Sequence, residues 1–404
     1  MSHTLSQQPF FLAQHRYLAL AIINALTAIV IVVMFMATAI DIPSEGNCTE
    51  RVIDFHAVWG AARLALSGTM IAAFDQEVLQ QAYLACDTDK LLYWLYPANM
   101  GLVLTPLGAL DFLSAFIGFQ LGSLALLALV ARRYLKNDMT ALIALVFAPA
   151  WLPALLVGQF TLLWCAGLLA AISAMRRDQH VIAGLLFGIL TLKPTLGLLI
   201  PVILLADRRY LTFAAATATT IGLHTGAAAH YGFSYITRWI EAAHAHGASM
   251  IHGLADGNAM SSFAAFLPRF GLRVEFGVFA NLGLVIAMAV IMFVVWRKHG
   301  AKSDQACALL CAAIPLSTPY LWHYDAGFTA LTALFIYRLA EHDRGPVFWI
   351  SLAILWAGAG ITIWNTYFFH ISAIYPTIVV PPILMMAFAF ALLQLRTRQP
   401  SLHT

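Results

Sequence analysis

The chain has 404 residues, of which 61% are hydrophobic and only 10% are charged, and its mean hydropathy is +0.81. Because soluble domains are about a quarter charged, this composition excludes a soluble globular protein and indicates an integral membrane protein. The formal net charge of +3 carries little information about partners. No segment is long and polar enough to fold apart, so we expect residues 1–404 to form a single transmembrane domain.

Apolar runs of helical length predict an all-α polytopic fold with about ten full spans. They lie at about 17–40, 100–131, 140–157, 160–175, 210–229, 273–296, 304–318, 326–340, 346–364 and 371–394. A signal peptide is an alternative for the first run, since Ala37-Thr38-Ala39 resembles a cleavage site. This run is longer than a usual signal core, so we interpret it as a membrane anchor.

A further apolar stretch, 182–205, is interrupted by Lys193-Pro194. Proline lacks a backbone donor and disfavours helix in the residue before it, so we expect two short helices that meet at this point. Lys193 then lies within the membrane. A charge at such depth is costly and usually lines a cavity or pairs with another charge. An anionic phosphate is one expected partner, and an internal salt bridge is the alternative.

The basic residues indicate an orientation, because cytoplasmic loops retain Lys and Arg. With the N-terminus inside, 15 of the 22 basic residues fall on the cytoplasmic side. These are Arg16, Arg132, Arg133, Lys136, Arg176, Arg177, Arg208, Arg209, Arg297, Lys298, Lys302, Arg338, Arg344, Arg396 and Arg398. We therefore expect a multi-pass membrane protein with both termini cytoplasmic.

Two external segments are long enough to carry function. The first loop, 41–99, is expected to form interfacial helices and to carry the candidate base, and the second segment is 230–272. Cys48 and Cys86 share the first loop, where an oxidising exterior permits a disulfide, although two free thiols remain the alternative. The other cysteines, Cys165, Cys307 and Cys311, lie in predicted spans.

Asp54 begins the stretch DFHAVWGAARLALSG, which follows the first span. At about 100° per residue, Arg63 lies about 180° from Asp54 around a helix and shares a face with His56. Asp54 instead lies beside small side chains, which leave room for a substrate. The alternative is an N-cap role, in which the carboxylate accepts backbone hydrogen bonds.

His323 is a second candidate, at the external boundary within PYLWHYDAGF, beside Tyr324 and Asp325. The alternative is a structural histidine bonded to a backbone carbonyl. His244, His246 and His252 match known metal sites poorly, so they are interpreted as part of an interfacial helix.

Six short motifs occur in the order DFHAVWGAARLALSG, YPANM, TPLGAL, GQF, LLFGILTLKP and PYLWHY. This order, over roughly residues 50–345, resembles the polyprenol-phosphate-mannose-dependent mannosyltransferases, which are GT-C-type integral-membrane enzymes of glycosyltransferase family 87. The family usually has a Tyr-rich stretch after its aspartate, whereas His56 and Trp59 stand here, so mannose is only the family default.

The resemblance implies sugar transfer at the outer face from a polyprenyl-phosphate carrier to a hydroxyl of a lipid or glycan acceptor, with inversion. Asp54 is then the general base and His323 positions the donor phosphate and sugar. Lys193 and Arg63 stabilise the leaving phosphate. Further substrate-binding candidates are Tyr96, Gln159, Asn258 and Tyr324. No cofactor or metal is expected, although Asp325 is a second acid that a metal ion could use as a ligand. The expected partners are membrane lipids and not nucleic acid.

Two other classes of function fit parts of the pattern. A transporter or flippase for lipid-linked glycans would use the same deep lysine and broken helix, but no inverted repeat is present in the sequence. A glycan ligase would be expected to have more basic residues in its external loops than the six found here: Arg51, Arg63, Lys90, Arg238, Arg269 and Arg273.

Overall fold

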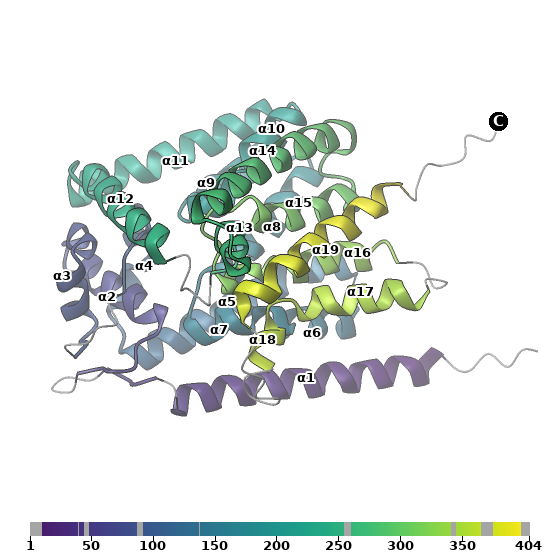
Figure 1. The fold of residues 1–404 in the computed structure, drawn as a ribbon, viewed down its shortest axis with the longest axis horizontal. Helices are drawn as coiled ribbons and strands as arrows, with labels where there is room; N and C mark the ends of the chain where they lie inside the picture. Colours follow the sequence, from purple (N-terminus) through teal and green to yellow (C-terminus); the bar gives the residue numbers. More distant parts are fainter. Residues whose placement is uncertain are drawn as a thin grey trace, which may run out of the picture.

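The computed structural model describes residues 10–38, 40–43, 48–86, 92–136, 138–253, 260–340, 345–364 and 375–396. The regular elements within these ranges are helices, accompanied by two isolated β-bridges (Figure 1). The expected class, an all-α membrane protein, is confirmed. Of the predicted site residues, Asn258 lies outside the described residues.

Five segments are long and apolar enough to cross a membrane. They include α1 (Phe10–Thr38), α5 (Phe112–Leu135), α6 (Met139–Val146) with η2 (Pro149–Trp151) and α7 (Leu152–Val157), α14 (Val274–His299) and α19 (Pro376–Arg396). Other helices of the bundle are α8 (Thr161–Arg176), α11 (Tyr210–Tyr231), α15 (Asp304–Leu316), α16 (Phe328–Tyr337), α17 (Pro346–Ala357) and α18 (Gly360–Trp364). About ten full spans were predicted, and five is the number that helix length and composition support among the described residues.

The predicted single helix over 100–131 is wrong. Two helices occupy this run, α4 (Asn99–Gly108) and α5, and the chain breaks between them. Asp111 is the reason, because its carboxylate accepts a hydrogen bond from the backbone N–H of Ser114 at 2.9 Å and so caps a new helix. The run 140–157 is also broken. Here the cause is Pro149, which has no backbone N–H and starts the short turn η2.

The predicted break at Lys193-Pro194 is confirmed. The stretch forms α9 (His180–Leu190), η3 (Pro194–Gly197) and α10 (Ile200–Ala206), and Lys193 immediately precedes η3. Gly184 and Gly188 let α9 pack directly on α11, since a Cβ at Gly184 would lie 2.4 Å from that of Ala215. Small residues at this four-residue spacing are typical of close helix packing in membranes.

One end of the molecule, here called the loop end, carries the short helices of the two predicted external segments (Figure 1). They are α2 (Asp54–Leu66), η1 (Met70–Phe74), α3 (Gln76–Ala82) and α12 (Tyr235–Gly253). The second segment also contains α13 (Phe263–Phe266) and η4 (Leu267–Phe270), which pack against α14 of the main helical body. Phe55 anchors α2 to α5, with ring centroids 5.1 Å from Phe116 and 5.6 Å from Phe112. These buried aromatic contacts fix the first turn of α2, where Asp54 lies.

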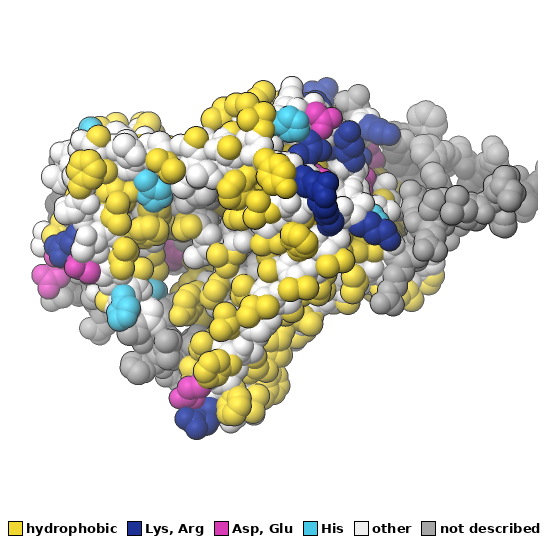
Figure 2. All heavy atoms as spheres, turned by 90° about the horizontal axis from the view of Figure 1, so that it is seen from above, with side chains coloured by type: hydrophobic (Ala, Val, Ile, Leu, Met, Phe, Trp, Pro, Cys, Tyr) yellow, Lys and Arg dark blue, Asp and Glu magenta, His cyan; other side chains and the backbone are white. Residues whose placement is uncertain are grey.

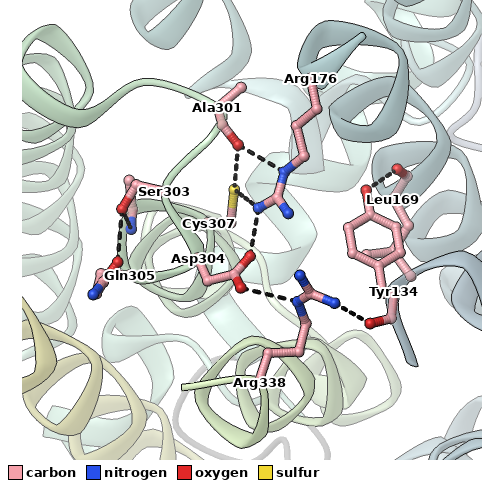
Figure 3. A network of polar contacts seen from close by, with 10 residues as sticks. Tyr134, Leu169, Arg176, Ala301, Ser303, Asp304, Gln305, Cys307 and Arg338 are labelled. Atoms are coloured by element: carbon pink, nitrogen blue, oxygen red, sulfur yellow. Dashed lines mark hydrogen bonds and ion pairs between the residues drawn. The ribbon is translucent and has the colours of Figure 1, made fainter. Parts of the chain in front are cut away.

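The opposite end is here called the basic end. Figure 2 shows Lys and Arg side chains gathered there, and in Figure 1 α1 starts and α19 finishes at this end. Asp304 joins three helices, because its two oxygens accept from Arg176 at 2.7 Å and from Arg338 at 2.9 Å (Figure 3). Arg338 also donates to the Tyr134 carbonyl. This network ties α8, α15 and α16 together at the basic end.

The predicted disulfide between Cys48 and Cys86 is confirmed, with Cα atoms 4.7 Å apart. The backbone supports it, because Thr49 donates to the Leu84 carbonyl at 2.8 Å and Cys86 donates to the Thr49 carbonyl at 3.0 Å. The bridge thus closes the segment that contains α2 and α3.

Replacing this bridge with Cys48→Ser/Cys86→Ser is expected to destabilise the α2–α3 segment by roughly 4 kcal/mol, because a closed loop of this length restricts the unfolded chain. Limited proteolysis of the purified protein measures the effect, with cleavage expected within residues 48–86. Cys165→Ser, which replaces a free cysteine in α8, is the control for thiol loss. Equal protease resistance in the double variant and the wild type would contradict the prediction.

Candidate active site

Asp54 is the first residue of α2, and its carboxylate reaches across the fold. Its Oδ2 accepts a hydrogen bond of 2.6 Å from the side-chain amide of Gln159, 105 residues away. The amide oxygen of Gln159 accepts in turn from the Tyr96 hydroxyl at 2.8 Å. Three residues that the sequence placed in one site therefore form a single chain of hydrogen bonds.

Asp54 is not the N-cap of α2, which was the alternative role considered for it. Ile53 occupies the cap position, and its N–H donates to Nδ1 of His56 at 3.0 Å. Since Nδ1 accepts, the ring proton is on Nε2, which donates to the Asp41 carbonyl at 3.2 Å. Burial lowers the pKa of His56 to about 4, in agreement with a neutral ring. His56 therefore accepts the backbone N–H at the start of α2, and the Asp54 carboxylate is left to contact other groups.

A glycine places Gln159 against Asp54. Gly158 ends α7 with φ of +76°, a conformation that favours glycine. A Cβ at this position would also lie 2.5 Å from the Cβ of Phe55, the neighbour of Asp54. The turn at Gly158 therefore brings the amide of Gln159 to the carboxylate.

Lys193 forms a buried ion pair beside this chain. Its Nζ lies 2.6 Å from Oδ1 of Asp325, and the two side chains are 7% and 4% exposed. The same oxygen accepts from the Thr161 hydroxyl at 2.6 Å. Asp325 lies in η5 (His323–Gly327), so the ion pair joins the α9–α10 break to the turn that carries His323. The internal salt bridge considered from the sequence is present.

Two tyrosine rings connect the ion pair to Asp54. The Lys193 ammonium lies 5.2 Å from the ring centroid of Tyr324 and 5.9 Å from that of Tyr96, within cation–π range. Tyr324 also hydrogen-bonds with Asp54. One compact cluster thus contains Asp54, Tyr96, Gln159, Thr161, Lys193, Tyr324 and Asp325.

The cluster has an accessible side and a buried side. Asp54, Tyr96 and His323 are partly exposed, whereas Gln159, Lys193 and Asp325 are buried. Protein atoms nevertheless surround Asp54 on most sides, and this desolvation raises the pKa of its carboxyl group, against smaller opposing effects of Gln159, Tyr324 and Lys193. Figure 2 shows the surface hollowed between the loop end and the main helical body. The raised pKa favours a base that takes up a proton readily.

Other predicted site residues lie differently. Arg63 donates to the Ala82 carbonyl at 2.7 Å, and its guanidinium lies 4.8 Å from the ring centroid of Trp59. These contacts are with α3 and α2 and not with the cluster. The ring of His323 lies 5.5 Å from that of Tyr324, at the edge of the cluster. The structure therefore brings together most of the predicted set and leaves Arg63 apart.

Sequence reasoning missed Thr161 and gave Asp325 only a minor role. Thr161 carried no signal beyond its place two residues after Gln159. For Asp325 a signal existed, because a lysine within the membrane needs a counterion and Asp325 adjoins His323 at the predicted boundary. Its pairing was not predictable without the tertiary fold.

Among the described residues, no group of three His, Cys, Asp or Glu side chains lies close enough to hold a metal ion. His246 instead packs its ring 4.6 Å from that of Tyr93. The side chain of His252 lies outside the described residues.

These features define a helical membrane protein with a polar cluster at one end. A comparison with known protein families matches residues 94–319, more than half of the chain, to glycosyltransferase family 87. The chain belongs to this family, as its motifs predicted, and it is a glycosyltransferase. The match contains Tyr96, Gln159 and Lys193, whereas Asp54, His323 and Tyr324 lie outside it. Comparisons with curated proteins and with solved structures gave no match.

Proposed function

We propose that this glycosyltransferase moves a sugar, by family default mannose, from a polyprenyl-phosphate carrier to a hydroxyl of a lipid or glycan acceptor, with inversion. One observation carries the proposal. The partly exposed carboxylate of Asp54 is held by the neutral amide of Gln159. Asp54 is the first residue of α2, which lies at the loop end in Figure 1. A carboxylate held in this way, with a raised pKa, is suited to act as a general base.

In this reaction Asp54 takes the proton of the acceptor hydroxyl as the acceptor oxygen bonds to the anomeric carbon. The bond from that carbon to the phosphate oxygen breaks on the opposite face, and its electron pair leaves with the polyprenyl phosphate. Phosphate is a good leaving group, so a second carboxylic acid is not needed.

The leaving phosphate gains charge as the bond breaks, and fixed cationic groups stabilise such charge. The Lys193 ammonium has three N–H donors, of which one faces Asp325. Lys193 is 6% exposed, so we assign it to the floor of the site, and we assign direct contact with the donor phosphate to the more exposed His323.

The distribution of charge supports an orientation with the basic end in the cytoplasm. Both termini then lie inside, and Asp54 faces the outer side of a bacterial inner membrane. A lipid-linked donor fits this location, because the polyprenyl chain keeps the sugar at the membrane surface.

A transporter of lipid-linked glycans is the second candidate, since helices broken near the membrane midplane are typical of transporters. The network of Arg176, Asp304 and Arg338 argues against it, because the network joins three helices at the basic end (Figure 3). A transport path would require these contacts to open.

The donor class is tested with purified protein in lipid vesicles and a membrane lipid extract as acceptor. Radiolabelled polyprenyl-phosphate-mannose is expected to give labelled glycolipid, whereas nucleotide-linked mannose gives none. Vesicles without the protein are the control. Transfer from the nucleotide sugar alone would overturn the proposed donor, and movement of intact donor across the bilayer without transfer would favour the transporter.

Gln159→Leu is expected to lower kcat about tenfold and to move the rise of activity to higher pH. The amide stabilises the ionised form of Asp54, so its loss raises the pKa of this carboxyl further. Tyr96→Phe should shift the profile in the same direction by less, because the Tyr96 hydroxyl orients the amide. The measurement is kcat/KM against pH, with Gln179→Leu at the basic end as control. A lower rate with an unmoved profile would show that Gln159 does not act on Asp54.

A further inference from the structure

A groove of about 700 Å³ is lined by residues of α1, α6, α16 and α17. In Figure 1 the helices α6, α16 and α17 lie toward the basic end. Its walls are mainly aliphatic and include Leu20, Ala141, Leu145, Ala330, Leu334 and Leu352. This volume falls within the usual range for ligand sites, about 300–1,000 Å³. None of the residues assigned to sugar transfer lines it.

The groove adjoins a second, more polar hollow of about 400 Å³. The two share Leu135, Tyr337 and Trp349, and the second is also lined by Lys136 and Arg338. Lys136 is exposed at the end of α5, while Arg338 is held in place by Asp304 and the Tyr134 carbonyl. A mainly apolar channel, which Asp138 also lines, therefore leads to a mouth with two cationic side chains, of which Lys136 is exposed and Arg338 is already paired with Asp304.

Aromatic residues mark the level of the mouth. Tyr337 lines both hollows, and its hydroxyl donates to Asp138 at 2.8 Å. Trp349 is 41% exposed. Tyr and Trp gather where membrane proteins meet lipid headgroups, so the mouth lies at headgroup level and the groove beneath it at acyl-chain level.

We propose that this groove binds one anionic glycerophospholipid of the leaflet at the basic end. An acyl chain fills the aliphatic part, and the phosphate-bearing headgroup lies against Lys136 and Arg338. Charge complementarity selects this occupant, since basic pockets between helices on the cytoplasmic side bind anionic headgroups. The lipid also bridges α1 and α17, and α1 is a largely exposed helix that packs on the body through few buried side chains.

Native mass spectrometry of the detergent-purified full chain tests the proposal, with phosphatidylglycerol and phosphatidylcholine of identical acyl chains as probes. The wild type is expected to bind one phosphatidylglycerol about fivefold more tightly than phosphatidylcholine. This is the difference in affinity that one lysine near an anionic headgroup contributes. Lys136→Gln should remove most of this preference. Lys298→Gln, an exposed lysine at the same end, should keep it.

Ala353→Trp places a large side chain into the groove from an exposed position, and it should weaken binding of both lipids. Ala214→Trp on the exposed face of α11 is its matched control. Equal binding of the two lipids by the wild type, or equal losses in Lys136→Gln and Lys298→Gln, would refute the site. Displacement of phosphatidylglycerol by polyprenyl phosphate in the wild type but not in Ala353→Trp would assign the groove to the donor and overturn the proposed occupant.

Discussion

Asp54→Asn is expected to reduce kcat for sugar transfer by about 10²–10⁴-fold, the usual contribution of a general base. Asparagine keeps an oxygen that can accept from Gln159, so the side chain retains its place. It has no basic site to receive the acceptor proton. The measurement is transfer from polyprenyl-phosphate-mannose at saturating acceptor. Glu77→Gln, an exposed acid on α3 at the same end, should leave the rate unchanged.

The same variant is expected to be more stable than the wild type at neutral pH. Burial raises the pKa of Asp54 above its value in the unfolded chain, so the folded protein binds this proton more tightly. The stabilisation from the protonated form is complete below the unfolded pKa and is lost as pH rises through the raised pKa. Asparagine is neutral throughout, so its advantage in Tm should grow from pH 4 to pH 7. A variant that keeps the wild-type kcat would remove Asp54 from the role of base, and a Tm advantage that does not grow with pH would contradict the raised pKa.

The hydrophobic pattern predicted the membrane class and the break at Lys193-Pro194 because both depend on local chemistry. It failed over 100–131, where hydropathy is continuous and only the cap at Asp111 divides the run. The disulfide was predicted because Cys48 and Cys86 share one loop. Span number was less predictable, since several apolar helices are shorter than a bilayer and lie beside longer ones.

The site was predicted in part by motif order and in part by helix phase. Motif order included Tyr96, Gln159 and Lys193, which the fold brings to Asp54 or to its neighbours. Helix phase placed Arg63 about 180° from Asp54 around α2, and in the structure Arg63 donates to the Ala82 carbonyl of α3. Its proposed role at the leaving phosphate stays a prediction. Partners such as Asp325 depend on contacts between distant segments, which spacing along the chain does not encode.

Lys193→Met is expected to destabilise the protein by about 3–5 kcal/mol, because it leaves the Asp325 carboxylate buried without its cation. Thermal unfolding in detergent measures the loss. This result alone does not distinguish a structural lysine from one that also acts on the donor phosphate, since an unstable variant also loses activity.

The double variant Lys193→Met/Asp325→Asn separates the two roles. Both charges are then absent, and asparagine can still accept from Thr161, so stability should return to within about 1–2 kcal/mol of the wild type. Transfer should remain about 10²-fold slow, because the cation near the leaving phosphate is gone while Asp54 is intact. Recovery of both stability and rate would confine Lys193 to a structural ion pair. If the ion pair served stability alone, restoring stability would also restore the rate. A stable but slow double variant would therefore show that Lys193 also acts in the reaction.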